Sequence, residues 1–263
     1  MTTILVRDVG AATFNFAADR NHGGRFSSFD PSVSDLRLVP KELPVRDARA
    51  VSPAPSLDVE GFAIAEHKLD DPRWFDEQWI SDVYAPSCDA LVKRLTGARE
   101  CIQLYRPFHR IADDSARCDH AMTAGFVHID FPRDAGEAQS RMYAEMAGKA
   151  FKKAAIYNVW KAISPAPQNR PLAVSDRRTV PEESFVIGMS VEVTSEAPYV
   201  ILTPSEGIRF YYYPDMRLDE SLIFLGNDFV AQNPLGCAHT AFTHPDGGTP
   251  RQSIESRVIA IFE

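Results

Sequence analysis

The chain has 263 residues, of which 44% are hydrophobic and 24% are charged. This composition is typical of a globular protein that can bury a hydrophobic core. Because all-β domains of this length are common, we expect one domain over residues 1–263. No stretch approaches the roughly 18 consecutive apolar residues of a membrane span. A net charge of −8 without a Lys/Arg-rich tract argues against nucleic acid or an anionic membrane as partner, and a small molecule is the expected partner.

The N-terminal segment is rich in Pro, Ser, Asp and Gly and shows little periodicity. Residues 1–60 are therefore predicted to form an extended arm laid over the body of the protein. The first twenty residues lack the basic and long apolar regions of a secretory signal, and the cysteines show no Cys-x-x-Cys spacing. These features predict a reduced, cytoplasmic protein.

Two helical segments are expected. In the segment 61–99, apolar residues recur three or four positions apart, with Pro86 predicted to break the helix in two and Gly97 to end it. A second helix is predicted over 136–153, where small and apolar residues again recur at helical spacing.

The region 100–263 is otherwise a succession of short β-like runs separated by Pro, Gly, Asp and Asn. This pattern predicts a mainly β fold, a β-sandwich or jelly roll with flanking helices. The runs are CIQLYRPF, GFVHIDF, AIYNVWKAI, PLAVSD, SFVIGMSVEV, PYVILTP, IRFYYYP, SLIFLGNDF, CAHTAFT and SIESRVIAIF.

One of these runs, AGFVHIDFP at 124–132, carries two polar side chains among apolar ones. Alternation along a strand points His128 and Asp130 to the same face, as a metal requires of two ligands on one strand. A second His-x-Asp, His244 and Asp246, leads into two glycines and is explained by a turn.

A third ligand has to come from another strand. His239 is the best candidate because it lies in a β-like run late in the chain, whereas His109 and His120 are expected to be ordinary histidines. Two histidines and one carboxylate that leave the other positions of a metal open are the pattern of non-heme iron(II) oxygenases.

The last β-like run adds an alternating polar face. Arg251, Ser253, Glu255 and Arg257 lie at period two, and an arginine fork there, with the serine hydroxyl, can bind the distal carboxylate of a keto acid. The alternative is a solvated polar face, which is common on C-terminal strands.

Several long stretches resemble a known family. They are ATFNFAADRNHGGRFSSFDPS, LVKRLTGARECIQL, NVWKAISPAPQNRPLAVSDRRTV, RFYYYPDMRLDESLIFLGNDF and AHTAFTHPDGGTPRQSIESRVIAIF, and together they cover nearly the whole chain. The sequence resembles the oxidoreductases grouped with the cephamycin methoxylation protein, gibberellin desaturase-like proteins and fungal meroterpenoid oxygenases. These are similar to iron(II)- and 2-oxoglutarate-dependent oxygenases.

The resemblance implies a double-stranded β-helix (cupin-like jelly roll) with Fe(II), 2-oxoglutarate and O2 as cofactor and co-substrates. His128, Asp130 and His239 match the metal positions. Arg251, Gln252 and Ser253 resemble the Arg-x-Ser motif that binds the co-substrate. The resemblance includes Arg257 as well, so either arginine can be the anchor, and we favour Arg251 for its motif and its shorter spacing from His239.

Asn158, in the stretch Asn-Val-Trp, resembles a signature residue of the same family. We expect its amide to orient a carboxylate of the co-substrate in the pocket. The alternative is that this stretch belongs to the core, as a tryptophan in a strand usually does.

Three functions are compatible with these residues. The first is a dioxygenase that performs C–H oxidation, by hydroxylation, desaturation or oxidative cyclisation, on a specialised metabolite or amino-acid-like compound. The second is a non-heme iron oxidase that does not consume 2-oxoglutarate. The third is a non-catalytic jelly-roll binding protein whose His and Asp satisfy buried polar groups.

Overall fold

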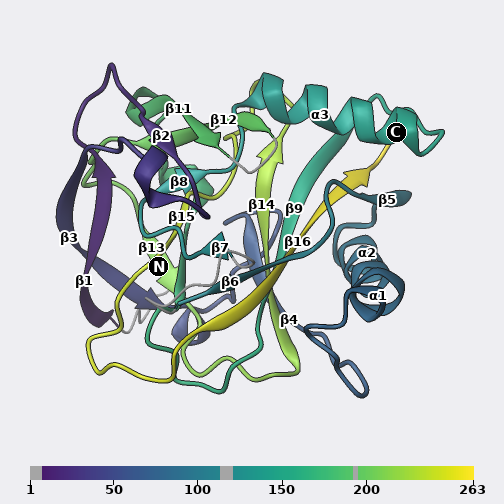
Figure 1. Cartoon of the computed structure of the whole chain (residues 1–263), viewed down its shortest axis with the longest axis horizontal. Coiled ribbons are helices and arrows are strands. Elements are labelled where there is room, and N and C mark those ends of the chain that lie inside the picture. The colour runs from purple at the N-terminus through teal and green to yellow at the C-terminus, as the bar shows by residue number, and fades with distance from the viewer. Residues whose placement is uncertain (1–7, 113–120, 192–194) are drawn as a thin grey trace.

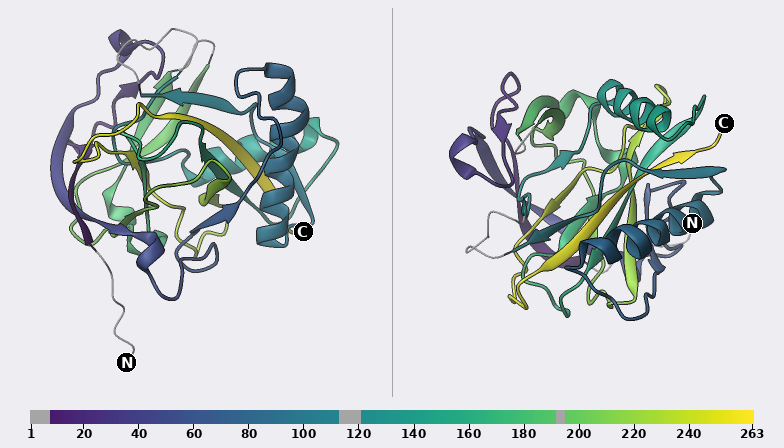
Figure 2. Two further views of the ribbon diagram at one scale, coloured as in Figure 1. Left: turned by 90° about the horizontal axis from the view of Figure 1, so that it is seen from below. Right: turned by 45° about the vertical axis from the view of Figure 1, so that its right-hand side comes forward.

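The computed structural model describes residues 8–112, 121–191 and 195–263. Two β-sheets face one another and the core lies between and around them, with helices at one side (Figures 1 and 2). The predicted mainly β jelly roll is thereby confirmed, and each of the ten predicted β-like runs contains a strand. That residues 1–263 form one domain stays a prediction.

The first sheet carries the candidate metal ligands. Its strands, in spatial order, are β1 (Asp8–Ala17), β3 (Leu38–Asp47), β13 (Phe210–Tyr212), β10 (Leu172–Ser175), β15 (His239–Ala241), β8 (His128–Ile129), β12 (Glu196–Leu202), β11 (Phe185–Val191) and β2 (Arg25–Phe26).

The second sheet lies opposite and carries the polar face of the last strand. Its order is β4 (Phe62–Glu66), β14 (Glu220–Asp228), β9 (Ala154–Ala162), β16 (Gln252–Ile261), β6 (Phe108–Ile111) and β7 (Ala121–Met122), while β5 (Glu100–Gln103) also pairs with β16. Residues of β9 are buried along its whole length because the first sheet covers one face and helix α2 packs against the other.

The helices lie outside the sheets. They are α1 (Glu77–Trp79), a π-helical turn η3 (Ile80–Tyr84), α2 (Ala85–Thr96) and α3 (Arg133–Met146). Short 3-10 turns occur at η1 (Pro31–Val33), η2 (Ala48–Ala50), η4 (Arg177–Thr179) and η5 (Glu182–Ser184). Helix α2 buries Cys88, Leu91 and Val92 against the outer face of the second sheet (Figure 2).

The predicted N-terminal arm over residues 1–60 is corrected for its described part, 8–60. Strands β1 and β3 form an antiparallel pair that extends the first sheet through a parallel contact of β3 with β13. Alternate residues of β1, Ala12, Phe14 and Phe16, are buried in the core, but the small and polar residues between and around them obscured this pattern in the sequence.

The predicted helical boundaries are corrected at three points. Residues 62–66 of the segment 61–99 form β4, a run too short for periodicity to separate strand from helix. Pro86 does not break the helix, because it lies in the first turn of α2 and the π-turn η3 joins α1 to α2. The second helix ends at Met146 and not at 153, since Gly148 has a left-handed backbone (φ 67°). Gly97 ends α2 as predicted, with φ 69°.

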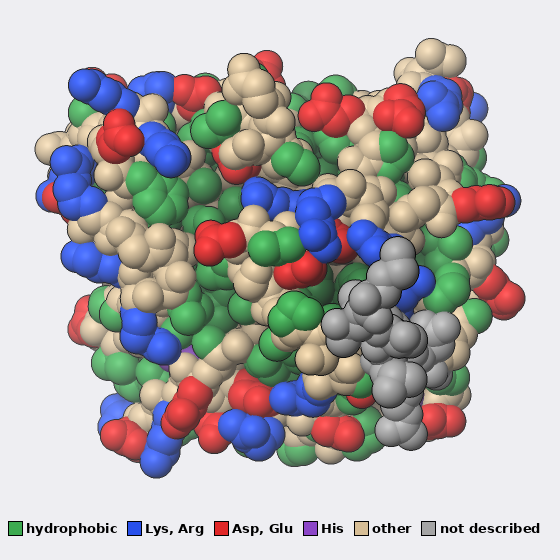
Figure 3. Space-filling view, turned by 180° about the vertical axis from the view of Figure 1, so that it is seen from behind, with side chains coloured by type: hydrophobic (Ala, Val, Ile, Leu, Met, Phe, Trp, Pro, Cys, Tyr) green, Lys and Arg blue, Asp and Glu red, His purple; other side chains and the backbone are tan. Residues whose placement is uncertain are grey.

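On the face drawn in Figure 3, acidic and basic side chains are interspersed. Among the residues that the structure describes, no helix is long and apolar enough to cross a bilayer.

Candidate metal centre

Three side chains meet at the inner face of the first sheet. His128 is on β8, Asp130 follows two residues later, and His239 is on β15, which pairs with β8 so that the two histidines are direct partners in register. One ligand atom from each residue lies within 4.8 Å of the others, and all three side chains are buried. Each histidine Nε2 is 3.8 Å from Asp130 Oδ1.

The backbone fixes the tautomer of both imidazoles. His128 Nδ1 lies 2.9 Å from the carbonyl oxygen of Phe126, and His239 Nδ1 lies 3.3 Å from that of Cys237. Because a carbonyl only accepts, Nδ1 carries the hydrogen and the Nε2 lone pairs face Asp130. Burial lowers the pKa of His128 to about 3 and lowers that of His239 as well, so both rings are neutral, the form that binds metals.

Asp130 is held at both oxygens. Arg257 donates from Nη2 to Oδ1 over 2.8 Å, and Asn158 donates from Nδ2 to Oδ2 over 2.7 Å. Burial alone would raise the pKa of this carboxyl, but the Arg257 guanidinium, together with the hydrogen bond from Asn158, holds it well below its usual range. The site therefore offers two neutral imidazoles and one oriented carboxylate.

In the structure the amide of Asn158 orients the Asp130 carboxylate. That it also orients a carboxylate of the co-substrate stays a prediction. Gly226 allows this position, since a Cβ there would approach Asn158 Oδ1 to 2.6 Å.

Arg257 is anchored from behind by a second carboxylate. Its Nε donates to Glu255 Oε1 over 2.9 Å, and the rings of Phe108 and Phe131 lie 5.2 and 5.4 Å from its guanidinium carbon. Alternation along the strand predicts that Glu255 lies on this face but assigns no role to it. The role follows from the packing of the two sheets, which brings Asp130 within reach of the guanidinium that Glu255 holds.

Arg251 directly precedes β16 and lies in a different environment. It is 1% exposed, donates from Nη1 to the carbonyl of Arg170 over 2.9 Å, and lies over the ring of Trp160. Within the described residues its Nε has no hydrogen-bond partner. Burial, with a further contribution from Arg110, lowers its pKa to about 9. A guanidinium stays protonated at the pH values where proteins work, so this shift marks a desolvated cation that an anion would stabilise.

Ser253, the other residue of the predicted co-substrate motif, donates its hydroxyl hydrogen to the carbonyl of Arg110 over 3.1 Å. The turn predicted at His244 and Asp246 is confirmed, and a hydrogen bond from the Gly247 N–H to the His244 carbonyl closes it. His120 lies outside the described residues.

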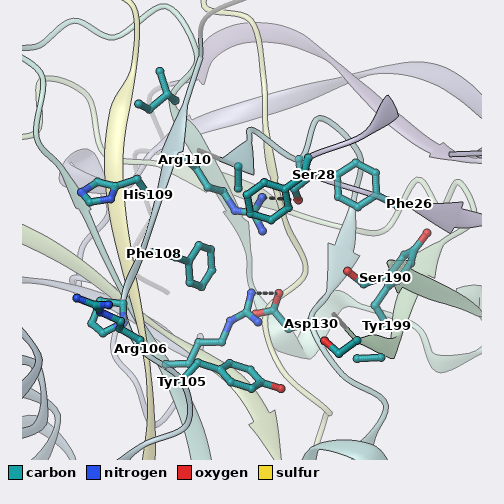
Figure 4. Close-up of a pocket in the computed structure, with 18 of the residues that line it drawn as sticks. Phe26, Ser28, Tyr105, Arg106, Phe108, His109, Arg110, Asp130, Ser190 and Tyr199 are labelled. Atoms are coloured by element: carbon teal, nitrogen blue, oxygen red, sulfur yellow. Dashed lines mark hydrogen bonds and ion pairs between the residues drawn. The ribbon is translucent and has the colours of Figure 1, made fainter. Parts of the chain in front are cut away.

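A cavity of about 990 Å³ opens beside this cluster (Figure 4). His128, Asp130 and Arg257 border it, whereas Arg251 is not among the described residues that line it. Fewer than half of the other described lining residues are phenylalanine, tyrosine or arginine, and alternation along single strands could not identify the lining because it comes from segments far apart in the chain.

Comparison with known proteins identifies the family. The family described as "Oxidoreductase/YMDC permease-like domain" matches residues 14–261. The chain belongs to this oxidoreductase family. The resemblance drawn from the sequence motifs is thereby confirmed.

Relatives of this chain include fungal proteins. "Oxidoreductase clz16" of Cochliobolus lunatus is 25% identical and covers 100% of this chain and 99% of its own. "Fe(II)/2-oxoglutarate-dependent dioxygenase nvfI" of Aspergillus novofumigatus is 28% identical over 86% of this chain and 85% of its own. A solved variant of the "iron and alpha-ketoglutarate-dependent endoperoxidase NvfI" superposes with a TM-score of 0.81 at 25% identity, covering 97% of this chain and 98% of that one.

Proposed function

We propose that this protein oxidises a C–H bond of a small specialised metabolite. It is a non-heme iron enzyme of the dioxygenase type, with Fe(II) as cofactor and 2-oxoglutarate and O2 as co-substrates. Relatives with the same cofactor and co-substrate in their names support this assignment. The observation that carries the proposal is the buried group of His128, Asp130 and His239 beside a large cavity.

In this proposal the three side chains hold Fe(II). Two neutral imidazoles and one carboxylate suit this ion, and the open positions are left for co-substrates. The surroundings support the assignment, because each Nδ1 is tied to a carbonyl and the carboxylate is tied to Asn158 and Arg257. Such outer contacts orient metal ligands and set their basicity.

The distal carboxylate of 2-oxoglutarate is assigned to Arg251. This buried guanidinium has an unpartnered Nε, whereas Arg257 already contacts two carboxylates. An anion beside Arg251 would compensate the cost of its burial. Ser253 lies two residues further along the same face of β16.

When bound, iron and the keto acid supply the oxidising power, as 2-oxoglutarate and O2 give succinate and CO2 while the substrate is oxidised. The chain supplies orientation and excludes water. The buried ring of Phe126 packs against His128, and the buried ring of Phe224 packs against His239. These rings exclude water from that side of the ligands. Whether hydroxylation, desaturation or cyclisation follows depends on which substrate carbon the cavity holds beside His128 and Asp130.

The test is an anaerobic titration of metal-free protein with iron(II) and 2-oxoglutarate, read as the visible charge-transfer band of a chelated keto acid. We expect the band in wild type and in His244→Ala, the matched control from the second His-x-Asp, and its loss in His239→Ala. Iron binding without the band would favour an oxidase that does not use 2-oxoglutarate. Absence of iron binding would favour a non-catalytic jelly roll.

A further inference from the structure

A second cavity lies next to the one that borders the candidate metal centre. It has a volume of about 650 Å³ and lies between helix α2, the link from β5 to β6, and helix α3; we call it the side pocket. The two cavities share Glu77, Tyr105, Arg106 and Pro107 in their walls. Figure 4 shows Tyr105 and Arg106 on the side of the larger cavity opposite Phe26.

Asp89, on α2, is an acid of the side pocket that has no basic partner. Gln103 donates from Nε2 to its Oδ1 over 2.6 Å, and among the described residues its other carboxylate oxygen accepts no side-chain hydrogen bond. Burial raises the pKa of Asp89 to about 6, and the hydrogen bond from Gln103 opposes this rise only in part. At neutral pH this carboxylate is therefore ionised at a free-energy cost, which a cation in the pocket would offset.

The second sheet fixes the direction of this carboxylate. The Gln103 amide also donates to the carbonyl of Ala85 over 3.1 Å, and its Oε1 accepts a hydrogen bond of 2.7 Å from the hydroxyl of Ser256, a buried residue of β16. Because both ends of the amide are engaged, its Nε2 faces Asp89. Asp89 is thus held in place, so that a ligand bound to it would lose little side-chain entropy on the protein side.

The rest of the wall suits an organic cation. Glu77 and Arg106 pair with one another over 3.0 Å, so their charges offset and the charge of Asp89 remains as the excess among the described lining residues. The rings of Tyr105 and Tyr143, which also line the pocket, meet edge to face at 5.5 Å between centroids. Tyrosine rings attract ammonium groups through their faces and pack against apolar groups.

We propose that the side pocket binds an organic ammonium ion, with Asp89 as its counter-ion and with Tyr105 and Tyr143 beside its apolar part. The ammonium group donates a hydrogen bond to the free oxygen of Asp89, while Gln103 holds the other oxygen. This site goes beyond the proposed function, because it uses none of the three candidate metal ligands. The ammonium group belongs either to the main substrate or to a separate small molecule, and the experiment distinguishes the two sources.

The experiment measures dissociation constants of phenethylamine and of phenethyl alcohol, its neutral analogue of similar size. Calorimetry is performed on the full chain with and without iron(II) and 2-oxoglutarate, under anaerobic conditions and above the pH at which Asp89 titrates. Wild type should bind the amine roughly tenfold more tightly than the alcohol, the size expected of one charge-assisted hydrogen bond. In Asp89→Asn this ratio should fall to about one while the affinity for the alcohol stays the same.

Two further variants fix the interpretation. Glu145→Gln is the matched control, because it removes the same charge from an exposed carboxylate of α3 that does not line the side pocket, and it should keep the tenfold ratio. Asp89→Glu keeps the charge and should keep part of the preference. Equal binding of amine and alcohol in wild type, or no binding of either, would overturn the proposal. A preference that survives in Asp89→Asn, or that Glu145→Gln abolishes to the same degree, would overturn it as well.

The charge-transfer band of the keto acid identifies the source of the ammonium group. A change in the band when phenethylamine is added, lost in Asp89→Asn, would support the site and assign the group to the main substrate. An unchanged band with the same Asp89-dependent binding would support the site and assign the group to a separate molecule. Asp89-dependent binding without any keto-acid band would leave this inference standing and refute the proposed function.

Discussion

Arg257, on the inner face of β16, and Arg251, which directly precedes that strand, have opposite surroundings. Arg257 contacts Asp130 and Glu255, and these carboxylates raise its pKa despite burial. Arg251 contacts a carbonyl and an aromatic ring, and burial lowers its pKa to about 9. Carboxylates of the chain itself neutralise Arg257, whereas Arg251 is a buried cation with no carboxylate contact among the described residues.

The largest effect on iron affinity is expected from removing the carboxylate of Asp130, which Arg257 contacts and Arg251 does not. Asp130→Ala takes away one of three protein ligands, so iron(II) affinity should fall by at least roughly 100-fold, more than for loss of an outer contact. Circular dichroism should show a folded protein. Asp246→Ala, in the exposed turn, is the control, and an iron affinity unchanged in Asp130→Ala would refute the three-ligand site.

Next is the arginine assigned to the co-substrate. Arg251→Gln should weaken 2-oxoglutarate by roughly 10- to 100-fold, the range expected for loss of a buried charge-assisted contact. Iron binding measured without the keto acid should change little, because Arg251 does not contact the three ligands. A larger loss of 2-oxoglutarate affinity in Arg257→Gln would exchange the two assignments.

Arg257→Gln should mainly weaken the binding of iron, and by a smaller factor than Arg251→Gln weakens the binding of 2-oxoglutarate. Loss of the contact to Asp130 Oδ1 should lower iron affinity about tenfold, since outer-shell contacts orient ligands without binding the metal. At saturating iron the affinity for 2-oxoglutarate should be close to that of wild type. Glu255→Gln, which loosens Arg257 while sparing Asp130, should show the same direction with a smaller effect, and a strengthened iron affinity would contradict the positioning role.

The smallest effect is a pH dependence of stability that Arg251 should not alter. His67, between Ser221 and Ser87, has its pKa lowered to about 4 by burial first and by Lys161 and Arg94 next. The unfolded chain takes up a proton below about pH 6.5 and the folded chain resists it until about 4, so the free energy of unfolding falls as pH falls through this window.

In His67→Gln this slope should be smaller by up to about 1.4 kcal/mol per pH unit. The measurement is denaturant unfolding of the metal-free protein between about pH 7 and pH 4.5. Arg251→Gln should run parallel to wild type. Equal slopes in wild type and His67→Gln would show that His67 titrates normally in the fold.

Much of this site was accessible from the sequence because it depends on local rules. Alternation along a strand placed His128 and Asp130 on one face, and a late β-like run supplied His239. The same rule placed Arg251 and Arg257 together. It could not separate them, because their difference depends on which groups the opposite sheet presents to each.

Strands were predictable from the sequence where apolar residues follow one another without interruption, as in β9. They were less predictable where polar or exposed residues interrupt the apolar ones. Strands β1 and β3 escaped notice because Pro, Asn and exposed residues interrupt the buried set, and β4 because it is short. The role of Asn158 depended on a contact across the sandwich to Asp130, which no spacing along the chain encodes.

The cavity beside the candidate metal centre draws on β2 and on the link from β2 to η1, which together supply Phe26, Ser28 and Phe29. This link is separated in the chain from both strands that present the histidines. Mutations or small insertions there can reshape the chamber while leaving the oxidising centre untouched. Such a division gives evolution, and protein engineers, a short stretch in which to exchange one substrate for another without rebuilding the chemistry.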